Sequence, residues 1–125
     1  MDGSLAQRRV KVNKVIVHPG EVNCVKVWPK QNKRFVATHS DCKSVYVWDL
    51  KSQKSAKDKH RVAANMPDLI LEGHTDLAAY ALDWSTIAPI VASGGKDRLI
   101  LLWNVEEHFT KTKGINFNSE EAQEE

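Results

Sequence analysis

The sequence predicts an all-β protein in which one unit is written twice. Three observations lead to this prediction: short strand-like segments recur between turn residues, helix signals are weak, and two stretches share the same order of residue types. The first stretch runs from His18 to Asp49 and the second from His74 to Asn104. Each begins with histidine, continues through a tryptophan and an alanine followed by a hydroxyl residue, and closes on an apolar run ending in tryptophan.

Eight segments have the composition of strands. The first, 10–17, alternates valine with polar residues imperfectly, as a half-buried or edge strand does. The other seven are rich in branched or aromatic residues, are bounded by turn residues, and lie at 22–28, 34–39, 44–50, 68–73, 78–84, 89–95 and 98–105. The acidic end of the chain has helix propensity, but its like charges repel and nothing apolar anchors it, so we expect disorder there.

The spacing of the two copies predicts the organisation of the chain. Trp48 and Trp103 lie further apart than the roughly 40 to 45 residues of a WD-type unit, and a basic insertion at 51–66 accounts for the excess. A charge run of this kind is usually a solvated loop, with binding to an anionic partner as the open alternative. The predicted boundaries are a disordered N-terminus at 1–9, two repeats within 10–109 (about 18–50 and 73–105), and a flexible acidic tail at 110–125.

A set of polar residues recurs at matched positions in the two copies. In a WD-type blade a histidine, a hydroxyl, a turn aspartate and a strand tryptophan can join by hydrogen bonds, which satisfies buried polar groups and fixes the turn. The second copy supplies all four: His74, Ser93, Asp97 and Trp103. The first copy supplies His18, Thr38 and Trp48. Its Asp41 lies one residue further from the closing tryptophan than Asp97 does, so that aspartate receives no role.

Other chemistries find little support. Ser93 lacks the sequence of a nucleophile elbow, so a catalytic triad is a weak alternative to the structural network and no enzyme activity is predicted. The histidines are scattered without ligand spacing, and we expect no metal and no cofactor. Cys24 and Cys42 lack a paired motif and are expected to be reduced.

No apolar stretch could span a bilayer and no apolar leader is found, so we expect a soluble intracellular protein without membrane contact. Direct nucleic-acid binding is not expected, because no aromatic residue lies among the basic ones.

Four motifs carry a resemblance to a known family: "HPGEVN" at 18–23, "WPKQN" at 28–32, "PDLILEGH" at 67–74 and "SGGKDRLILLW" at 93–103. Over roughly 10–109 the chain resembles the retinoblastoma-binding and MSI-type WD-repeat histone-binding proteins, most closely the plant FVE-like branch. The resemblance implies two four-stranded blades of a seven-bladed β-propeller. It also implies a nuclear, non-catalytic histone-binding scaffold in chromatin-modifying complexes of the deacetylase or Polycomb type, with a role in transcription repression. Members of this family are several hundred residues long, so the chain is expected to be a fragment.

The resemblance also implies binding residues. Glu21 and Asn23 are expected to face the propeller top and bind a basic tail of a core histone, with Tyr80 as an aromatic at the same surface. The acidic residue that the family places beside that aromatic is Ala78 or Ala79 here. An alternative function, substrate receptor or assembly scaffold of a ubiquitin ligase, rests on "WDLK" at 48–51, which approximates a W-D-x-R box. Lys51 cannot reproduce the guanidinium fork of that box.

Overall fold

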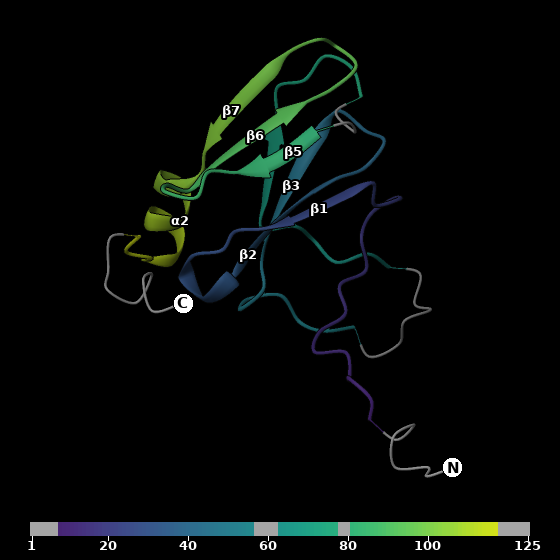
Figure 1. Ribbon diagram of the computed structural model, residues 1–125, viewed down its shortest axis with the longest axis vertical. Coiled ribbons are helices and arrows are strands. Elements are labelled where there is room, and N and C mark those ends of the chain that lie inside the picture. The colour runs from purple at the N-terminus through teal and green to yellow at the C-terminus, as the bar shows by residue number, and fades with distance from the viewer. Residues whose placement is uncertain (1–7, 57–62, 78–80, 118–125) are drawn as a thin grey trace.

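The computed structural model describes residues 8–56, 63–77 and 81–117, which form two antiparallel sheets followed by a short helix (Figure 1). The first sheet, blade 1, has the strand order β1-β2-β3-β4. Its strands are β1 (Cys24–Val27), β2 (Phe35–His39), β3 (Ser44–Asp49) and β4 (Leu69–Glu72). A single 3₁₀ turn, η1 (Gln31–Lys33), connects β1 to β2.

The second sheet, blade 2, has the strand order β5-β6-β7. Its strands are β5 (Ala81–Trp84), β6 (Ile90–Gly94) and β7 (Ile100–Asn104). After β7 the described chain turns into α2 (Glu106–Lys113), which begins where β7 ends and lies beside the end of blade 1 (Figure 1). Blade 1 receives its fourth strand, β4, from residues that follow the insertion. The residues that follow β7 form a helix instead, so blade 2 has three described strands.

The core lies between the two blades. All five residues of β2 are buried, because this strand is internal in its sheet and has blade 2 against one face. The strands β5, β6 and β7 instead alternate between more and less exposed residues, as strands do when one face of the sheet is covered. The buried apolar cluster draws on both blades and on α2: Trp28, Phe35, Ala37, Val45, Val47, Leu71, Leu82, Trp84, Val91, Val105, Phe109 and Ile115.

The predicted all-β class with two blades is confirmed, and each of the seven strands predicted after the first segment is present. The first segment, 10–17, is not a strand. Its backbone bonds the insertion: the Ala56 amide donates to the Val15 carbonyl at 2.8 Å, and the Asn65 amide donates to the Val17 carbonyl at 2.8 Å. These isolated bonds form no ladder, because no described strand lies alongside the segment.

The prediction of a flexible tail over 110–125 is wrong for its first part. Residues 106–113 are helical, Phe109 is buried, and Ile115 is buried after the helix ends at Gly114. Packing of Phe109 on Phe35, with ring centroids 4.7 Å apart, holds this segment against blade 1. The rest of the predicted tail, beyond 117, and most of the predicted disordered N-terminus lie outside the described residues. In the described part of the chain, no helix is long and apolar enough to cross a membrane.

Candidate functional site

The antiparallel strands give the blades two edges with different connections. The top edge carries the loop at 18–23, the β2–β3 turn at 40–43 and the β6–β7 turn at 95–99. The bottom edge carries the β1–β2 connection, the segment after β3, and α2. These two edges are the places where loop residues can contact another molecule.

In the second repeat the structure brings together all four residues of the predicted network. Asp97 Oδ2 lies 2.9 Å from His74 Nδ1, and His74 Nε2 lies 2.8 Å from the Ser93 hydroxyl oxygen. The Trp103 indole N–H donates to the same hydroxyl oxygen at 2.8 Å. Asp97 also accepts the Thr75 amide at 2.8 Å, which fixes the turn at 95–99 to the residue after His74.

These distances resemble those of a catalytic triad, but the environment differs. With its Nδ1–H donated to Asp97, His74 accepts the Ser93 hydroxyl proton at Nε2, and the hydroxyl in turn accepts the Trp103 N–H. Ser93 is 2% exposed and the His74 side chain is fully covered, so a substrate has no path to the hydroxyl. The arrangement therefore fixes a turn and satisfies buried polar groups.

Gly73 shows why a glycine precedes the histidine. A Cβ atom at this position would lie 2.6 Å from Cη2 of Trp103, closer than such atoms pack. The glycine therefore lets the indole ring lie against the backbone while its N–H reaches Ser93. In the first repeat the matching position is Val17.

The first repeat forms a smaller network without a carboxylate. His18 Nε2 lies 2.8 Å from the Thr38 hydroxyl, and the Trp48 indole N–H donates to that hydroxyl at 2.9 Å. The other ring nitrogen of His18 contacts the Gly20 carbonyl at 3.3 Å. Burial lowers the pKa of His18 below its ordinary value, with the Gly20 backbone opposing the shift.

The hairpin register explains why the first network lacks an acid. Thr38 pairs with Tyr46 as Ser93 pairs with Leu101, so the two hairpins have equal length. The position that matches Asp97 is then Cys42, which is a free thiol, and Asp41 falls one residue early. Asp41 is exposed.

The predicted tail-binding residues lie on the loop that the first network holds. Glu21 and Asn23 are both exposed at the top edge of blade 1. The Asn23 backbone amide donates to the His39 carbonyl at 2.9 Å, and the His18 ring lies 3.3 Å from the Gly20 carbonyl, so the loop is held at both ends. Tyr80, Ala78 and Ala79 lie outside the described residues.

Charge differs along the top edge. Near blade 1 the exposed residues Glu21 and Asp41 are acidic, with Lys43 next to them in the β2–β3 turn. In blade 2 the β6–β7 turn exposes Lys96 and Arg98. A basic ligand at this edge would be attracted toward the carboxylates of blade 1 and repelled by the turn of blade 2.

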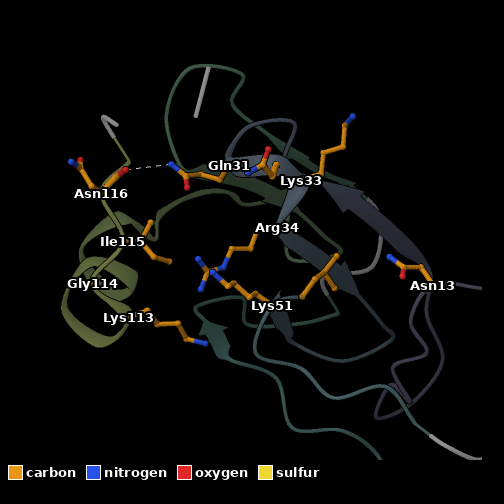
Figure 2. A pocket seen from close by; sticks show the side chains of 11 residues that line it. Asn13, Gln31, Lys33, Arg34, Lys51, Lys113, Gly114, Ile115 and Asn116 are labelled. Carbon is orange, nitrogen blue, oxygen red and sulfur yellow. Dashed lines mark hydrogen bonds between the residues drawn. The ribbon is translucent and has the colours of Figure 1, made fainter. Parts of the chain in front are cut away.

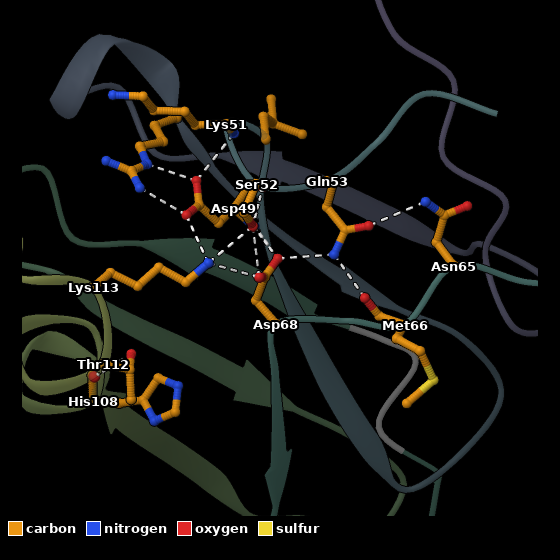
Figure 3. Close-up of polar contacts among 12 residues, drawn as sticks. Asp49, Lys51, Ser52, Gln53, Asn65, Met66, Asp68, His108, Thr112 and Lys113 are labelled. Atoms are coloured by element: carbon orange, nitrogen blue, oxygen red, sulfur yellow. Dashed lines mark hydrogen bonds and ion pairs between the residues drawn. The ribbon is translucent and has the colours of Figure 1, made fainter.

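An ion cluster at the bottom edge, which sequence reasoning missed, is shown in Figure 3. Asp49 accepts two bonds from Arg34, at 2.6 and 2.8 Å, and one from Lys113 at 2.9 Å. Lys113 also donates to Asp68 at 2.8 Å, and the Asp49 amide donates to Asp68 at 2.7 Å. The cluster therefore ties the end of α2 to β3 and to the residue that precedes β4. Its members lie far apart in the sequence, so the Trp48-Asp49 dipeptide was the one sequence feature that pointed to this place.

The Asp49 carboxylate carries the strongest electrostatic shift of the cluster. Burial opposes its ionisation, but the hydrogen bonds from Arg34 and Lys113 outweigh burial and lower its pKa to about 2. Asp68 follows the same balance, with burial opposing and Lys113 lowering its pKa. Asp49 has no exposed side-chain surface. Asp49 is fully engaged within the cluster, while Lys51 is exposed and lines the pocket beside it, so docking of a ligase adaptor through the 48–51 box stays a prediction.

A pocket of about 830 Å³ opens beside this cluster (Figure 2). Its charged lining is entirely basic: Lys33, Arg34, Lys51 and Lys113. The lining offers no carboxylate to a basic histone tail, so the top edge is the better candidate for such a ligand. In the described chain no group of His, Cys, Asp or Glu residues could hold a metal ion.

Comparison with known proteins agrees with this geometry. The family model described as WD domain, G-beta repeat matches residues 10–49 and 66–104. The two matched ranges contain the two networks and all seven strands.

Three relatives illustrate the likeness. WD-40 repeat-containing protein MSI4 of Arabidopsis thaliana is 45% identical over 101 residues, which is 81% of this chain and 20% of the relative. Glutamate-rich WD repeat-containing protein 1 of Dictyostelium discoideum is 36% identical, over 78% of this chain and 20% of the relative. Histone acetyltransferase type B subunit 2 of Schizosaccharomyces pombe is 27% identical, over 83% of this chain and 23% of the relative. The chain thus spans about a fifth of the length of these curated relatives. The predicted resemblance to MSI-type proteins is confirmed.

Proposed function

Because the chain belongs to the WD-repeat family, we propose that it serves as part of a non-catalytic scaffold that binds a basic core-histone tail at the top edge of blade 1. The observation that carries the proposal is the exposed Glu21 carboxylate on a loop fixed at both ends. Similarity to a histone acetyltransferase subunit and to MSI4 supports a chromatin setting, with complexes of the deacetylase or Polycomb type as partners and the nucleus as the compartment.

The chemistry of the loop suits a lysine or arginine side chain. A carboxylate accepts charge-assisted hydrogen bonds from either cation, and the side-chain carboxamide of the neighbouring Asn23 can accept a hydrogen bond from the peptide backbone or donate one to it. The contacts of the chain support an ordered loop, because the Asn23 backbone amide already bonds the His39 carbonyl and the His18 ring already contacts the Thr38 hydroxyl. Preorganisation of this kind lowers the entropy cost of binding.

The test is the affinity of a labelled core-histone tail peptide for the wild-type chain and for Glu21→Gln, titrated at two salt concentrations. The substitution keeps size and removes charge, so affinity should fall by about 1 to 3 kcal/mol if the carboxylate forms a charge-assisted bond. The loss should shrink at high salt, because screening weakens the contact.

A matched control is Glu107→Gln, which removes an exposed carboxylate on α2 at the opposite edge. This variant should bind the peptide like the wild type. Equal affinities of Glu21→Gln and wild type at low salt would remove Glu21 from the site. An equal loss in both variants would show attraction to net charge rather than a site.

A further inference from the structure

The basic pocket at the bottom edge, which we call the bottom pocket, has a composition that the proposed function does not use. Its walls come from the 10–17 segment, from η1 and Arg34, from the residues after β3, and from the end of α2 with the residues that follow it. The described lining contains no carboxylate and no aromatic ring. It contains four cationic side chains (Lys33, Arg34, Lys51 and Lys113) and four carboxamides (Asn13, Gln31, Asn32 and Asn116).

Two of the cations are fixed in place and still reach the pocket. Asp49 accepts two hydrogen bonds from the Arg34 guanidinium, and the Lys113 ammonium donates to Asp49, Ser52 and Asp68. The side chains of Arg34 and Lys113 nevertheless keep 22% and 21% of their surface exposed, whereas that of Asp49 is fully covered. A ligand in the bottom pocket therefore meets the cations, while the carboxylates that balance them are not part of the lining.

The other two cations give the pocket an excess of positive charge. Lys33 and Lys51 are exposed, and within 8–56, 63–77 and 81–117 neither ammonium group has an ion-pair partner. Figure 2 shows the side chain of Lys51 directed into the hollow with those of Arg34 and Lys113, and Lys33 at its rim. Because Asp49 and Asp68 balance only the first two cations, an anion that binds here gains attraction from both lysines.

The wall formed by η1 exists before a ligand binds. Residues 31–33 all have positive φ angles, between 55° and 58°, a conformation that residues with a side chain rarely adopt. The Lys33 amide donates to the Lys30 carbonyl at 3.0 Å, which holds the turn. The Gln31 carboxamide donates to the Asn116 carbonyl at 3.4 Å, which joins the turn to the segment after α2 (Figure 2). A prebuilt wall lowers the entropy cost of binding.

The lining also indicates which class of anion fits. The bases of a nucleic-acid strand bind by stacking on aromatic rings, and the described lining has none. A peptide backbone instead needs hydrogen-bond donors and acceptors, which the four carboxamides supply together. A volume of about 830 Å³ is more than a single small anion fills and is enough for a short peptide segment.

From this combination we propose that the bottom pocket binds an acidic peptide segment of a partner protein, with Lys33 and Lys51 pairing with its Asp or Glu carboxylates. The carboxamides of the lining bond the backbone of the segment. The chain then binds segments of opposite charge at its two edges: a basic one near Glu21 and an acidic one in the bottom pocket. Lys51 begins the basic insertion, so this proposal assigns an anionic partner to part of that charge run.

The test is titration of the chain with a labelled oligoglutamate peptide, with oligoglutamine as the uncharged probe. In heteronuclear NMR spectra the amide signals of residues 31–34, 50–51 and 113–116 should shift with oligoglutamate and stay in place with oligoglutamine. The double variant Lys33→Gln with Lys51→Gln should bind oligoglutamate roughly tenfold more weakly, because each exposed ion pair contributes up to about a fivefold factor. Both lysines are exposed, so the variant should remain folded, which circular dichroism checks.

The matched control is Lys43→Gln with Lys96→Gln, which removes the same charge from exposed sites at the top edge. This control should bind oligoglutamate like the wild type. The chain's own residues 118–125 include four glutamates, so the titrations are repeated with Glu120→Gln, Glu121→Gln, Glu124→Gln and Glu125→Gln combined, which removes an acidic competitor.

Four results would each overturn the proposal. The first is no binding of oligoglutamate by either form of the chain, and the second is an equal loss of affinity in the two lysine double variants. The third is a set of shifts at the basic turn 95–99 in place of the bottom pocket. The fourth is an oligothymidine that binds more tightly than oligoglutamate with the same dependence on Lys33 and Lys51, which would assign the pocket to nucleic acid. None of these readouts involves Glu21 or a histone peptide, so their failure is distinct from failure of the proposed function.

Discussion

Trp28 and Trp84 join the two blades by a reciprocal contact. Their rings stack with centroids 5.7 Å apart and an interplanar angle of 26°. The Trp28 indole N–H donates to the Ser85 carbonyl at 2.8 Å, and the Trp84 indole N–H donates to the Lys26 carbonyl at 2.9 Å. Each tryptophan follows the histidine of its own repeat at the same distance, so one repeated residue forms both halves of the junction.

Replacing Trp84 by phenylalanine should lower the free energy of unfolding by about 1 to 3 kcal/mol, because the Lys26 carbonyl loses its donor and the core loses ring volume. Trp28→Phe should lower the free energy of unfolding by a similar amount. In a double-mutant cycle measured by urea unfolding, the two changes should be non-additive, since each removes part of one contact. Additive losses would show that the rings do not interact energetically.

Ser93→Ala should destabilise the fold, because the Trp103 N–H and the His74 ring nitrogen both lose their partner in a buried place. The expected loss is about 1 to 3 kcal/mol, measured by denaturant unfolding. Thr86→Ala, at an exposed site on the bottom edge, is the control and should change stability little. A Ser93→Ala chain as stable as the wild type would contradict the role assigned to the network.

Gly73→Ala should cost about 1 to 3 kcal/mol of stability, because the added methyl group would meet the Trp103 ring at 2.6 Å. Gly94→Ala offers a sharp comparison, since its added methyl group would meet neighbours at 3.7 Å, an ordinary contact. Thermal unfolding of the two variants should therefore separate them. If both lose stability equally, crowding against Trp103 is not the reason for the glycine.

His39 should make the stability of the fold depend on pH between about 6.5 and 4. The side chain is 0% exposed, and burial together with nearby His74 lowers its pKa to about 4, with the Ala81 backbone opposing. The unfolded chain binds this proton near pH 6.5, so stability should be full above that pH and should fall by about 2 to 3 kcal/mol as the pH drops toward 4. Urea unfolding at several pH values should show a smaller slope for His39→Leu. Identical slopes would exclude His39 as the source.

Asp49 should make the stability of the fold depend on pH in a lower range, below about 3.8. Because its pKa is lowered from 3.8 to about 2, it contributes stability that is present above pH 3.8 and is lost as the pH falls through about 2. Arg34→Gln removes the bidentate partner and should destabilise the chain at pH 7 by more than Lys33→Gln, a change at the exposed rim of the same pocket. Equal effects of these two substitutions would show that the Arg34–Asp49 pair adds nothing to stability.

Much of the fold could be predicted because its signals are local. The alternation of apolar residues and the turn residues between them placed seven strands, since a strand with one buried face must alternate with a period of two. The spacing of His74, Ser93, Asp97 and Trp103 predicted a network that the structure brings together, because residues on paired strands keep a fixed register. The sequence by itself therefore determined the repeated unit and its internal contacts.

Tertiary structure decided the features that depend on distant partners. The 10–17 segment alternates like a strand but finds no strand alongside, while α2 has weak helix signals and is held by Phe109 packing on Phe35. The Asp49–Lys113 pair joins residues that no periodicity links. The exposure of Ile100 and Leu102, against the burial of Val45 and Val47 at the same repeat positions, is set by which faces meet. Contacts between blades depend on three-dimensional packing, because the polarity pattern of one strand does not identify the face of the other blade that packs on it.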